Sequence, residues 1–587
     1  LASKMPTGGK KDFSKNNTNR KRERSQSFGD RKNGPKKFAA NKQGKPHAQP
    51  TNPKEARKVQ QEKREYRKSL RTHHDLVTQA KTYWERIRDT VNVTTPERKK
   101  LIEELLNLIE GLLMDLIRKH DGSRIIQTCI KYGSAEQRKK IFKELEGHFL
   151  ELAQKKYSRF LVNRFLDSAS KEQKESIFKE FYGNVISMIT HKEACEVIEK
   201  AYQQSSGIQK TLFVEEFYGN EYALFKTTKS RKLEDILKEN PEKEEQIMKS
   251  IMDSINTLLT KGLIYLSISH HVLNEFYDNA SPEKIREMTS LLSPELIHTV
   301  RTRYGSQVAV KCVGYATAKE RKIIIKSLKG SVGAICQEPN GHMFIVKLLD
   351  VTDDTVLLSK AILREMLENA DHLVTDGNGR LPFLQVLAPE ENRTRYFAPP
   401  SMKLLEPNLV PGPDNTLVSS SKKDSEVRRK ELLASIDNEI VEYCSEHVSD
   451  MISDKFGFAV LLETLLNAES NKKNIIDEIL KLVKKGKDNE NHVLIDPVAS
   501  RFIKTLITTD FTYNNNEINF AEEIFKIIES QLLYWSLKAY SSAIVIALLK
   551  NSQTSKQAIQ KLKPNRSKLE KEQKSVRGVA HIITLLQ

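Results

Sequence analysis

The sequence predicts an all-α fold in which short helical repeats stack into an α-solenoid. From about residue 97 onward, apolar residues recur at the helical spacing, and no segment sustains the alternation of a strand. A short polar motif also recurs at intervals of about 36 residues. Stacked helical repeats of this length bury one continuous core, since no single repeat can cover its own apolar face.

Residues 120–130 contain the clearest copy of the motif. Ile125, Ile126, Cys129 and Ile130 form one apolar stripe, which predicts the buried face of a helix. Ser123, Arg124 and Gln127 fall together on another face, within about one turn of each other. This small polar group has the size needed to contact the edge and the ring face of one nucleotide base.

The position of Ser123 recurs along the chain, each time followed by an apolar helix, a polar turn and a further helix. In the first series, successive copies lie 35 to 40 residues apart. The copies are at Ser158, Ala194, Ser230, His270, Ser306, His342 and Arg380, then less regularly at Phe458, Ser500 and Ser541, with a remnant at Gly578. We therefore expect about eleven repeats, some eight of them within residues 96–390 and the others within residues 426–587.

Two stretches interrupt this helical pattern. Residues 391–425 are rich in proline, which fixes φ and removes hydrogen-bond donors, so they predict a loop or insertion. Residues 1–52 have almost no aliphatic side chains and predict a disordered basic arm. Residues 53–95 predict a basic helical extension, which docks on the fold by the packing of Tyr83, Trp84 and Ile87.

Charge is concentrated at the start of the chain. Residues 1–100 carry 28 Lys and Arg against 10 Asp and Glu, a net charge of +18, whereas the remainder carries 68 against 67. Such an arm suits a polyanion, either nucleic acid or an anionic membrane surface. Residues 20–24 and 31–37 are basic clusters of the nuclear-import type. The chain opens on Leu1 rather than Met, which leaves open whether sequence precedes it.

Other classes of protein are disfavoured. The five cysteines are scattered without C-x-x-C spacing, which is typical of buried, reduced thiols in an intracellular protein. No apolar run approaches the ~18–20 residues of a membrane span. Residues 376–387 resemble part of a calcium loop, but Leu387 stands where an acidic ligand is needed. No catalytic or phosphate-cradling motif occurs, so we expect no enzyme activity, cofactor or metal.

Residues 122–127 resemble the RNA-reading helix of Pumilio-homology (Puf) repeats, in which one repeat reads one base. The resemblance implies that Ser123 and Gln127 contact a base edge, suited to adenine, while Arg124 stacks on the ring. Ser230, Arg231 and Glu234 match a guanine-reading triplet in the same way. Ser158 and Arg159 also match, but Val162 stands at the third position and cannot form a hydrogen bond.

The remaining repeats depart from this pattern, and their third positions are mostly aliphatic. The triplets are Ala194/Cys195/Ile198, His270/His271/Asn274, Ser306/Gln307/Val310, His342/Met343/Val346, Arg380/Leu381/Leu384, Phe458/Ala459/Leu462, Ser500/Arg501/Lys504 and Ser541/Ser542/Val545. Aliphatic side chains do not discriminate bases by hydrogen bonds. About two of eleven repeats keep a readable triplet, so the code is largely lost.

A Puf array with a lost code resembles the divergent nucleolar branch of the family, the Puf-A and Penguin-like proteins. Residues 83–88, 220–225 and 318–322 and the C-terminal lobe carry this resemblance, which covers residues 80–587. It implies a right-handed, bent (L-shaped) solenoid in two lobes. It also implies binding of RNA or DNA with little sequence preference, and a role in assembly of the large ribosomal subunit.

Without a code, affinity should come from phosphates, and therefore from Lys and Arg. The candidate RNA contacts, besides the three triplets above, are Arg118, Lys119, Lys131, Arg164 and Lys192. We expect a nuclear, mainly nucleolar protein that binds pre-rRNA and contacts the pre-60S particle and ribosomal proteins, is a monomer outside it and binds no membrane. The alternatives are an mRNA-binding translational repressor and a protein-interaction solenoid without RNA contact.

Overall fold

The computed structural model describes residues 57, 60–61, 73–224, 231–411, 416–486, 492–513, 518–573, 576 and 578–587. The chain divides into a unit at Leu1–His74 and a unit at Asp75–Gln587. The predicted basic arm, its import-type clusters and most of residues 53–72 lie outside the described residues, as does Ser230.

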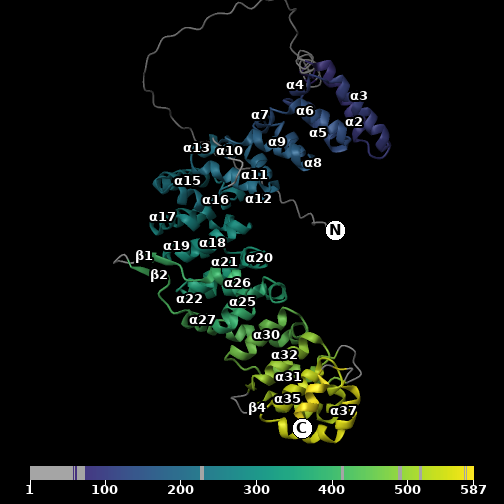
Figure 1. Cartoon of the computed structure of the whole chain (residues 1–587), viewed down its shortest axis with the longest axis vertical. Helices are drawn as coiled ribbons and strands as arrows, with labels where there is room; N and C mark the ends of the chain where they lie inside the picture. The colour runs from purple at the N-terminus through teal and green to yellow at the C-terminus, as the bar shows by residue number, and fades with distance from the viewer. Residues whose placement is uncertain are drawn as a thin grey trace, which may run out of the picture. The chain divides into compact units, whose positions relative to one another are not determined.

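The predicted helical repeats are present in the second unit (Figure 1). One helix in each repeat carries the motif position, and we call this helix the inner helix. The inner helices are α5 (His120–Tyr132), α8 (Arg159–Ser168), α11 (Cys195–Gln204), α16 (Ser267–Asn279), α18 (Arg303–Tyr315), α21 (His342–Val351), α25 (Arg380–Leu387), α30 (Gly457–Asn467), α32 (Pro497–Thr508), α35 (Ser541–Lys550) and α38 (Val579–Leu585).

Shorter helices precede most inner helices, and helices of variable length follow them. The preceding ones are α4 (Leu113–Ile117), α7 (Phe149–Ala153), α10 (Val185–Thr190), η3 (Ser293–His298), α20 (Val332–Gln337), α24 (Ala370–Leu373), α29 (Val448–Ile452) and α34 (Leu532–Ser536). The following ones are α6 (Ala135–Leu145), α9 (Lys171–Phe181), α12 (Gly207–Val214), α17 (Pro282–Leu292), α19 (Ala318–Ser327), α22 (Thr355–Leu358), η4 (Ser359–Leu363), α23 (Arg364–Glu368), α31 (Lys473–Val483), α33 (Phe520–Ile528), η6 (Glu529–Gln531), α36 (Ser555–Leu562), η7 (Lys563–Asn565) and α37 (Arg566–Glu572). The array begins with α2 (His74–Arg88) and α3 (Thr95–Leu108).

Each inner helix packs against the next one, from α5 and α8 through α16, α18 and α21 to α35 and α38. Ile126, Val162 and Ile198, on three successive inner helices, are fully buried. Within the described residues, the buried apolar side chains form one cluster that extends from Ala80 to Leu586. This continuous core confirms the predicted all-α solenoid.

The unit predicted at Ser230 departs from the others, because α11 packs directly against α16. Between them lie η1 (Glu215–Tyr218), α13 (Asn220–Leu224), α14 (Leu233–Glu239), η2 (Pro241–Lys243) and α15 (Glu244–Thr260). The seven-residue α14 buries only Leu233 and Ile236, too small an apolar face for a complete layer. It packs against α16 instead. The prediction that the residues around Ser230 form a repeat like the others was therefore wrong.

N-caps close the turns after several inner helices. The Ser134 and Ser170 hydroxyl oxygens accept hydrogen bonds from the backbone N–H groups of Gln137 and Gln173. The side-chain oxygens of these glutamines accept in turn from the backbone N–H groups of the two serines. In the repeat of α19 the cap is Thr317, and Glu320 completes the capping box. These caps fix where α6, α9 and α19 begin.

Residues 391–425, the predicted insertion, contain regular elements. They include most of η5 (Glu390–Arg395), then α26 (Pro399–Leu405) and an antiparallel pair of strands, β1 (Leu409–Pro411) and β2 (Leu417–Ser419). In this pair Val410 lies opposite Val418. The helices α27 (Ser425–Ala434) and α28 (Asp437–Glu446) follow, and a second strand pair, β3 (Thr512–Tyr513) and β4 (Ile518–Asn519), lies between α32 and α33.

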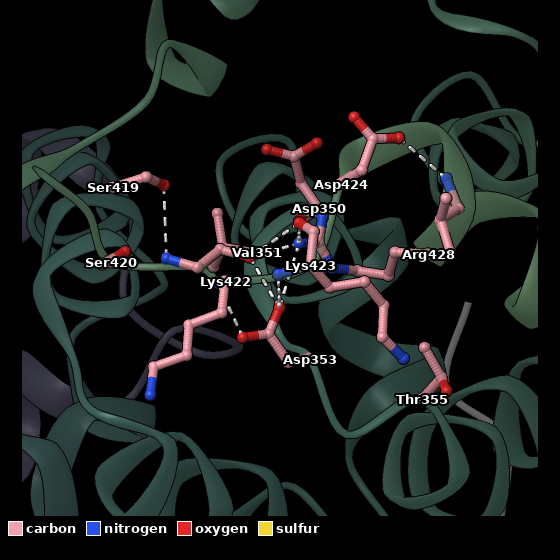
Figure 2. A network of polar contacts seen from close by, with 12 residues as sticks. Asp350, Val351, Asp353, Thr355, Ser419, Ser420, Lys422, Lys423, Asp424 and Arg428 are labelled. Carbon is pink, nitrogen blue, oxygen red and sulfur yellow. Dashed lines mark hydrogen bonds and ion pairs between the residues drawn. The ribbon is translucent and has the colours of Figure 1, made fainter.

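Asp353, after α21, holds the start of α27 in place. Its carboxylate accepts hydrogen bonds from the backbone N–H of Lys422 (2.9 Å) and of Lys423 (3.2 Å) and from the Ser421 hydroxyl (2.7 Å), and Arg428 pairs with it at 3.1 Å (Figure 2). Burial alone raises its pKa, but these hydrogen bonds outweigh burial and lower the pKa of Asp353 to about 2.

Buried arginines satisfy the carbonyl groups around this junction. The Arg428 side chain is 3% exposed and donates to the carbonyl oxygens of Lys423, at 2.7 Å, and Asp350. Arg321 is also buried and donates to the carbonyl of Val351 at 2.7 Å and to the Ser420 hydroxyl at 2.6 Å. The last carbonyl groups of a helix have no N–H partner within the helix. Here the guanidinium groups supply the hydrogen bonds that these carbonyl groups need.

Gly122→Ala should destabilise the protein, because a Cβ at this position would lie 2.1 Å from the Leu116 carbonyl oxygen. We expect a loss of about 1–3 kcal/mol in the free energy of unfolding, measured by urea denaturation. Gly207→Ala is the matched control, since a Cβ there meets no atom within 4 Å. Equal effects of the two substitutions would contradict the close packing between α4 and α5.

Asp353→Asn should destabilise the protein at neutral pH and less so in acid. Because the folded-state pKa of Asp353 lies below its ordinary value of 3.8, its stabilisation is present above that value and disappears as the pH falls toward about 2. Urea midpoints at pH 7, 5, 4 and 3 should therefore converge with those of the wild type as the pH falls. Asp235→Asn, at an exposed site, is the control. A difference in urea midpoint between Asp353→Asn and the wild type that stays constant with pH would contradict the lowered pKa of Asp353.

Candidate nucleic-acid interface

The helix α2 docks onto the first inner helix through Trp84, as predicted. The indole N–H donates to the Thr128 hydroxyl oxygen at 2.8 Å. The guanidinium groups of Arg88 and Arg124 lie 4.5 Å and 5.6 Å from the centre of the indole ring. Two arginines from different helices therefore contact one indole ring, which is a local concentration of positive charge.

The first triplet is engaged inside the protein. Ser123 is 1% exposed and its hydroxyl donates to the Tyr157 carbonyl at 2.8 Å, in the loop that leads to the next inner helix. The Gln127 amide donates in turn to the Ser123 oxygen at 2.9 Å. Arg124 remains exposed. By the resemblance to Puf repeats, the Ser123 hydroxyl would contact a base edge. In this structure it forms a hydrogen bond between two repeats instead.

The second triplet is also engaged. Ser158 is fully buried and donates to the Leu152 carbonyl at 2.7 Å. Arg159 forms ion pairs with Glu193 at 3.0 Å and with Glu196 at 2.6 Å, and only 17% of its side chain is exposed. Its guanidinium is therefore largely neutralised within the protein.

The third triplet is not assembled. Arg231 precedes α14, where its backbone N–H donates to Glu215 and its guanidinium lies 3.4 Å from Glu239. Glu234 lies in the first turn of α14, and a hydrogen bond from Lys238 lowers its pKa. Because these partners are local, Arg231 and Glu234 do not form a base-reading pair.

The other predicted cations lie on three successive layers, those of α5, α8 and α11. Arg118 is exposed and pairs with Glu151 at 2.9 Å, and Lys119 is half-buried. Lys131, Arg164 and Lys192 form no ion pair with any described carboxylate, although Lys131 lies over the Tyr132 ring. These three side chains can neutralise phosphates without first breaking an internal ion pair.

Sequence reasoning missed two arginine–aromatic contacts at the first two triplets. Trp84 is contacted by both Arg88 and Arg124, and Arg159 lies 4.5 Å from the centre of the half-exposed Phe160 ring. The available signal was an arginine close to an aromatic residue on the same helix. Surface pairs of this kind can stack with unpaired bases.

All five cysteines are buried and form no disulfide, and burial raises the pKa of Cys129 to about 12. Among the described residues, no cluster of His, Cys, Asp and Glu is arranged to hold a metal ion. In the same part of the chain, no helix combines the length and the apolar character needed to cross a bilayer.

Comparison with known proteins places this geometry in a family. The Pumilio-family RNA binding repeat matches residues 122–146, 148–181 and 184–217, the layers that carry the first three motif positions. The CPL (NUC119) domain matches residues 375–518.

Full-length relatives and a solved structure extend the likeness to most of the chain. "Pumilio homology domain family member 6" of Schizosaccharomyces pombe is 30% identical over 531 residues, covering 89% of this chain and 82% of the relative. Human "Pumilio homolog 3" is 30% identical over 493 residues, with 82% and 74% covered. The crystal structure of human Puf-A in complex with DNA has a TM-score of 0.78 and 29% identity, covering 88% of this chain and 100% of Puf-A. The chain therefore belongs to the Pumilio-homology repeat family, in the group that includes Pumilio homolog 3 and Puf-A.

Proposed function

We propose that this protein binds RNA mainly through the phosphate backbone, with little preference for base sequence. The observation that carries the proposal is the internal use of Ser123, Ser158 and Arg159, whereas Lys131, Arg164 and Lys192 stay available nearby. Contacts to phosphates supply affinity and position but carry no sequence information. The complex of human Puf-A with DNA supports this reading, since DNA and RNA share the phosphate backbone.

Electrostatics supply a second argument. The net charge of +18 in residues 1–100 attracts a polyanion over long range, while the rest of the chain is nearly neutral. Each phosphate that a cation neutralises releases condensed counterions, so affinity falls steeply with salt. The arm then supplies much of the attraction, and the cations on α5, α8 and α11 supply the local contacts.

In the cell, we propose, the RNA is pre-rRNA and the process is assembly of the large ribosomal subunit in the nucleolus. Residues 20–24 and 31–37 suit nuclear import, and a folded precursor offers shape and phosphates rather than a short base sequence. The resemblance of residues 80–587 to the nucleolar Puf-A and Penguin-like branch motivates this assignment. Pre-60S particles and ribosomal proteins are then the expected partners, and the protein is a monomer outside the particle.

The combined variant Lys131→Glu, Arg164→Glu and Lys192→Glu should bind RNA at least about tenfold more weakly than the wild type. The plot of log affinity against log salt has a negative slope, and the magnitude of this slope should decrease by about 2, since three phosphate contacts are lost. Fluorescence anisotropy with a single-stranded RNA measures both quantities.

The matched control is Lys504→Glu, Lys550→Glu and Lys571→Glu, which changes the charge equally at exposed lysines in the C-terminal half. Equal losses in the two variants would contradict a local interface and leave only a general charge effect. A wild-type protein without RNA affinity would instead favour the protein-interaction solenoid.

A translational repressor that reads mRNA is the second candidate, because Arg124 is exposed and Gln127 is only half-buried. We expect Gln127→Ala to leave base preference unchanged, since the Gln127 amide already bonds to Ser123, and to cost about 0.5–1.5 kcal/mol of stability. Competition among RNAs that differ at one base measures the preference. A base-specific loss of about 1–3 kcal/mol would favour the mRNA reader.

Crosslinking in cells followed by sequencing of the bound RNA tests the cellular role. The proposal predicts recovery chiefly of large-subunit rRNA and its spacers. Recovery chiefly of mRNA 3′ regions would reject it in favour of the repressor.

A further inference from the structure

The helix α19 carries a row of lysines on the side that faces solvent. Lys319, Lys322 and Lys326 are exposed, and their spacing of three and four residues places them on one face of the helix. Ile323 lies within this row and is also exposed, whereas the opposite face, which includes Ile324, is buried. We call the three lysines and Ile323 the lysine face.

The lysines of this face have no ion pair and no hydrogen-bond partner among the described residues. Glu320, the carboxylate that α19 itself carries, is already engaged with α17. It lies 3.0 Å from Arg286, and it accepts a hydrogen bond from the Ser290 hydroxyl. The positive charge of the lysine face is therefore not balanced by a carboxylate of its own helix.

This arrangement of charge is unfavourable for the helix itself. Lys322 and Lys326 lie one turn apart, so their like charges repel each other. Lys319 lies in the first turn, where the helix dipole disfavours a cation. An anionic partner relieves both effects, and charge complementarity therefore favours the binding of acidic groups at the lysine face.

Three features favour an acidic protein segment over nucleic acid as the partner. Ile323 is 40% exposed between the lysine stems, which suits an aliphatic side chain and not a phosphate. The exposed residues of α19, a helix that the structure describes throughout, include no aromatic ring or arginine on which a base could stack. The neighbouring helix α17 exposes Glu283 and Glu287, so a phosphate chain that follows the array meets negative charge there (Figure 1).

The acidic segment belongs to another molecule. The sequence outside the described residues contains no run of acidic side chains, and residues 1–100, which include most of it, carry a net charge of +18. The helix α19 has 10 residues. At the rise of an α-helix this is a length of about 15 Å, which matches a helical partner segment of about ten residues.

We propose that the lysine face is a docking site for an acidic segment of another protein. An aliphatic side chain of the segment packs against Ile323, and carboxylates on either side of it pair with the three lysines. The site lies on α19, which carries no motif position, so it is separate from the proposed RNA contacts on α5, α8 and α11. The protein can then bind RNA and an acidic protein at the same time.

Carbodiimide crosslinking of the full chain to a fluorescent peptide tests the site. The peptide has about ten residues, glutamate and aspartate around a central leucine, because this length matches α19. The reagent joins a carboxylate to a lysine amine in contact with it, so mass spectrometry should find adducts on Lys319, Lys322 or Lys326. The same peptide serves for fluorescence anisotropy at about 150 mM salt, which screens long-range attraction by the arm. Reversal of the three lysines to glutamate should weaken its binding at least about tenfold.

The matched control is Lys556→Glu, Lys563→Glu and Lys568→Glu, which reverses as many exposed lysines near the end of the chain. Ile323→Ser leaves the charge unchanged and should weaken peptide binding about threefold, because an apolar contact is lost. Ile208→Ser, at an exposed isoleucine of α12, should have no effect. Unchanged thermal unfolding of each variant confirms that the fold is intact.

RNA binding separates this inference from the proposed function. The lysine-face variant should bind RNA as well as its control does, and the combined variant Lys131→Glu, Arg164→Glu and Lys192→Glu should retain the peptide. Adducts confined to residues 1–72, or equal losses of peptide in the lysine-face and control variants, would overturn the docking site even if RNA binds as proposed. Loss of RNA with retention of the peptide in the lysine-face variant would also overturn it, and would make α19 an RNA contact.

Discussion

The packing of each inner helix against the next one is the interaction on which the rest of the structure depends. Ile126, Val162 and Ile198 are fully buried on three successive inner helices. Because one layer covers only one face of its neighbour, no layer is stable alone, and stability is shared along the stack. Each surface group is then positioned by the layer that carries it. The helices α5, α8 and α11 therefore lie in three adjacent layers, and each layer contributes cations although these are distant in sequence.

Polar side chains at the first motif position reinforce this seam. Ser123 donates to the Tyr157 carbonyl, Ser306 donates to the Asn340 carbonyl, and His270 meets Thr302. In each case the partner lies in the loop that leads to the following inner helix. The position at which a Puf repeat contacts a base is used here to join two layers. This gives a physical reason why the repeats retain polar residues at that position without retaining a code.

At the break between the two repeat series, hydrogen bonds from buried arginines supplement apolar packing. Arg428 and Arg321 bind carbonyl groups at the ends of α18 and α21, and Arg429 donates to the carbonyls of Val386 and Leu387 at the end of α25. A guanidinium offers five donors in a planar fork, so one side chain satisfies several carbonyl groups. The prolines predicted an interruption here, but the partners of these arginines lie up to 99 residues away and leave no local signal.

The sequence by itself determined the helices, the repeat period, the buried stripe of each inner helix and the caps at Ser134 and Ser170. These features depend on spacing and propensity within a few residues, and such patterns are visible in the chain. Only the tertiary structure decided that α14 stays outside the row and that Ser123 and Arg159 are engaged internally. Those outcomes depend on partners in other layers, typically more than 30 residues away, because hydrogen bonding and burial are settled by what packs alongside.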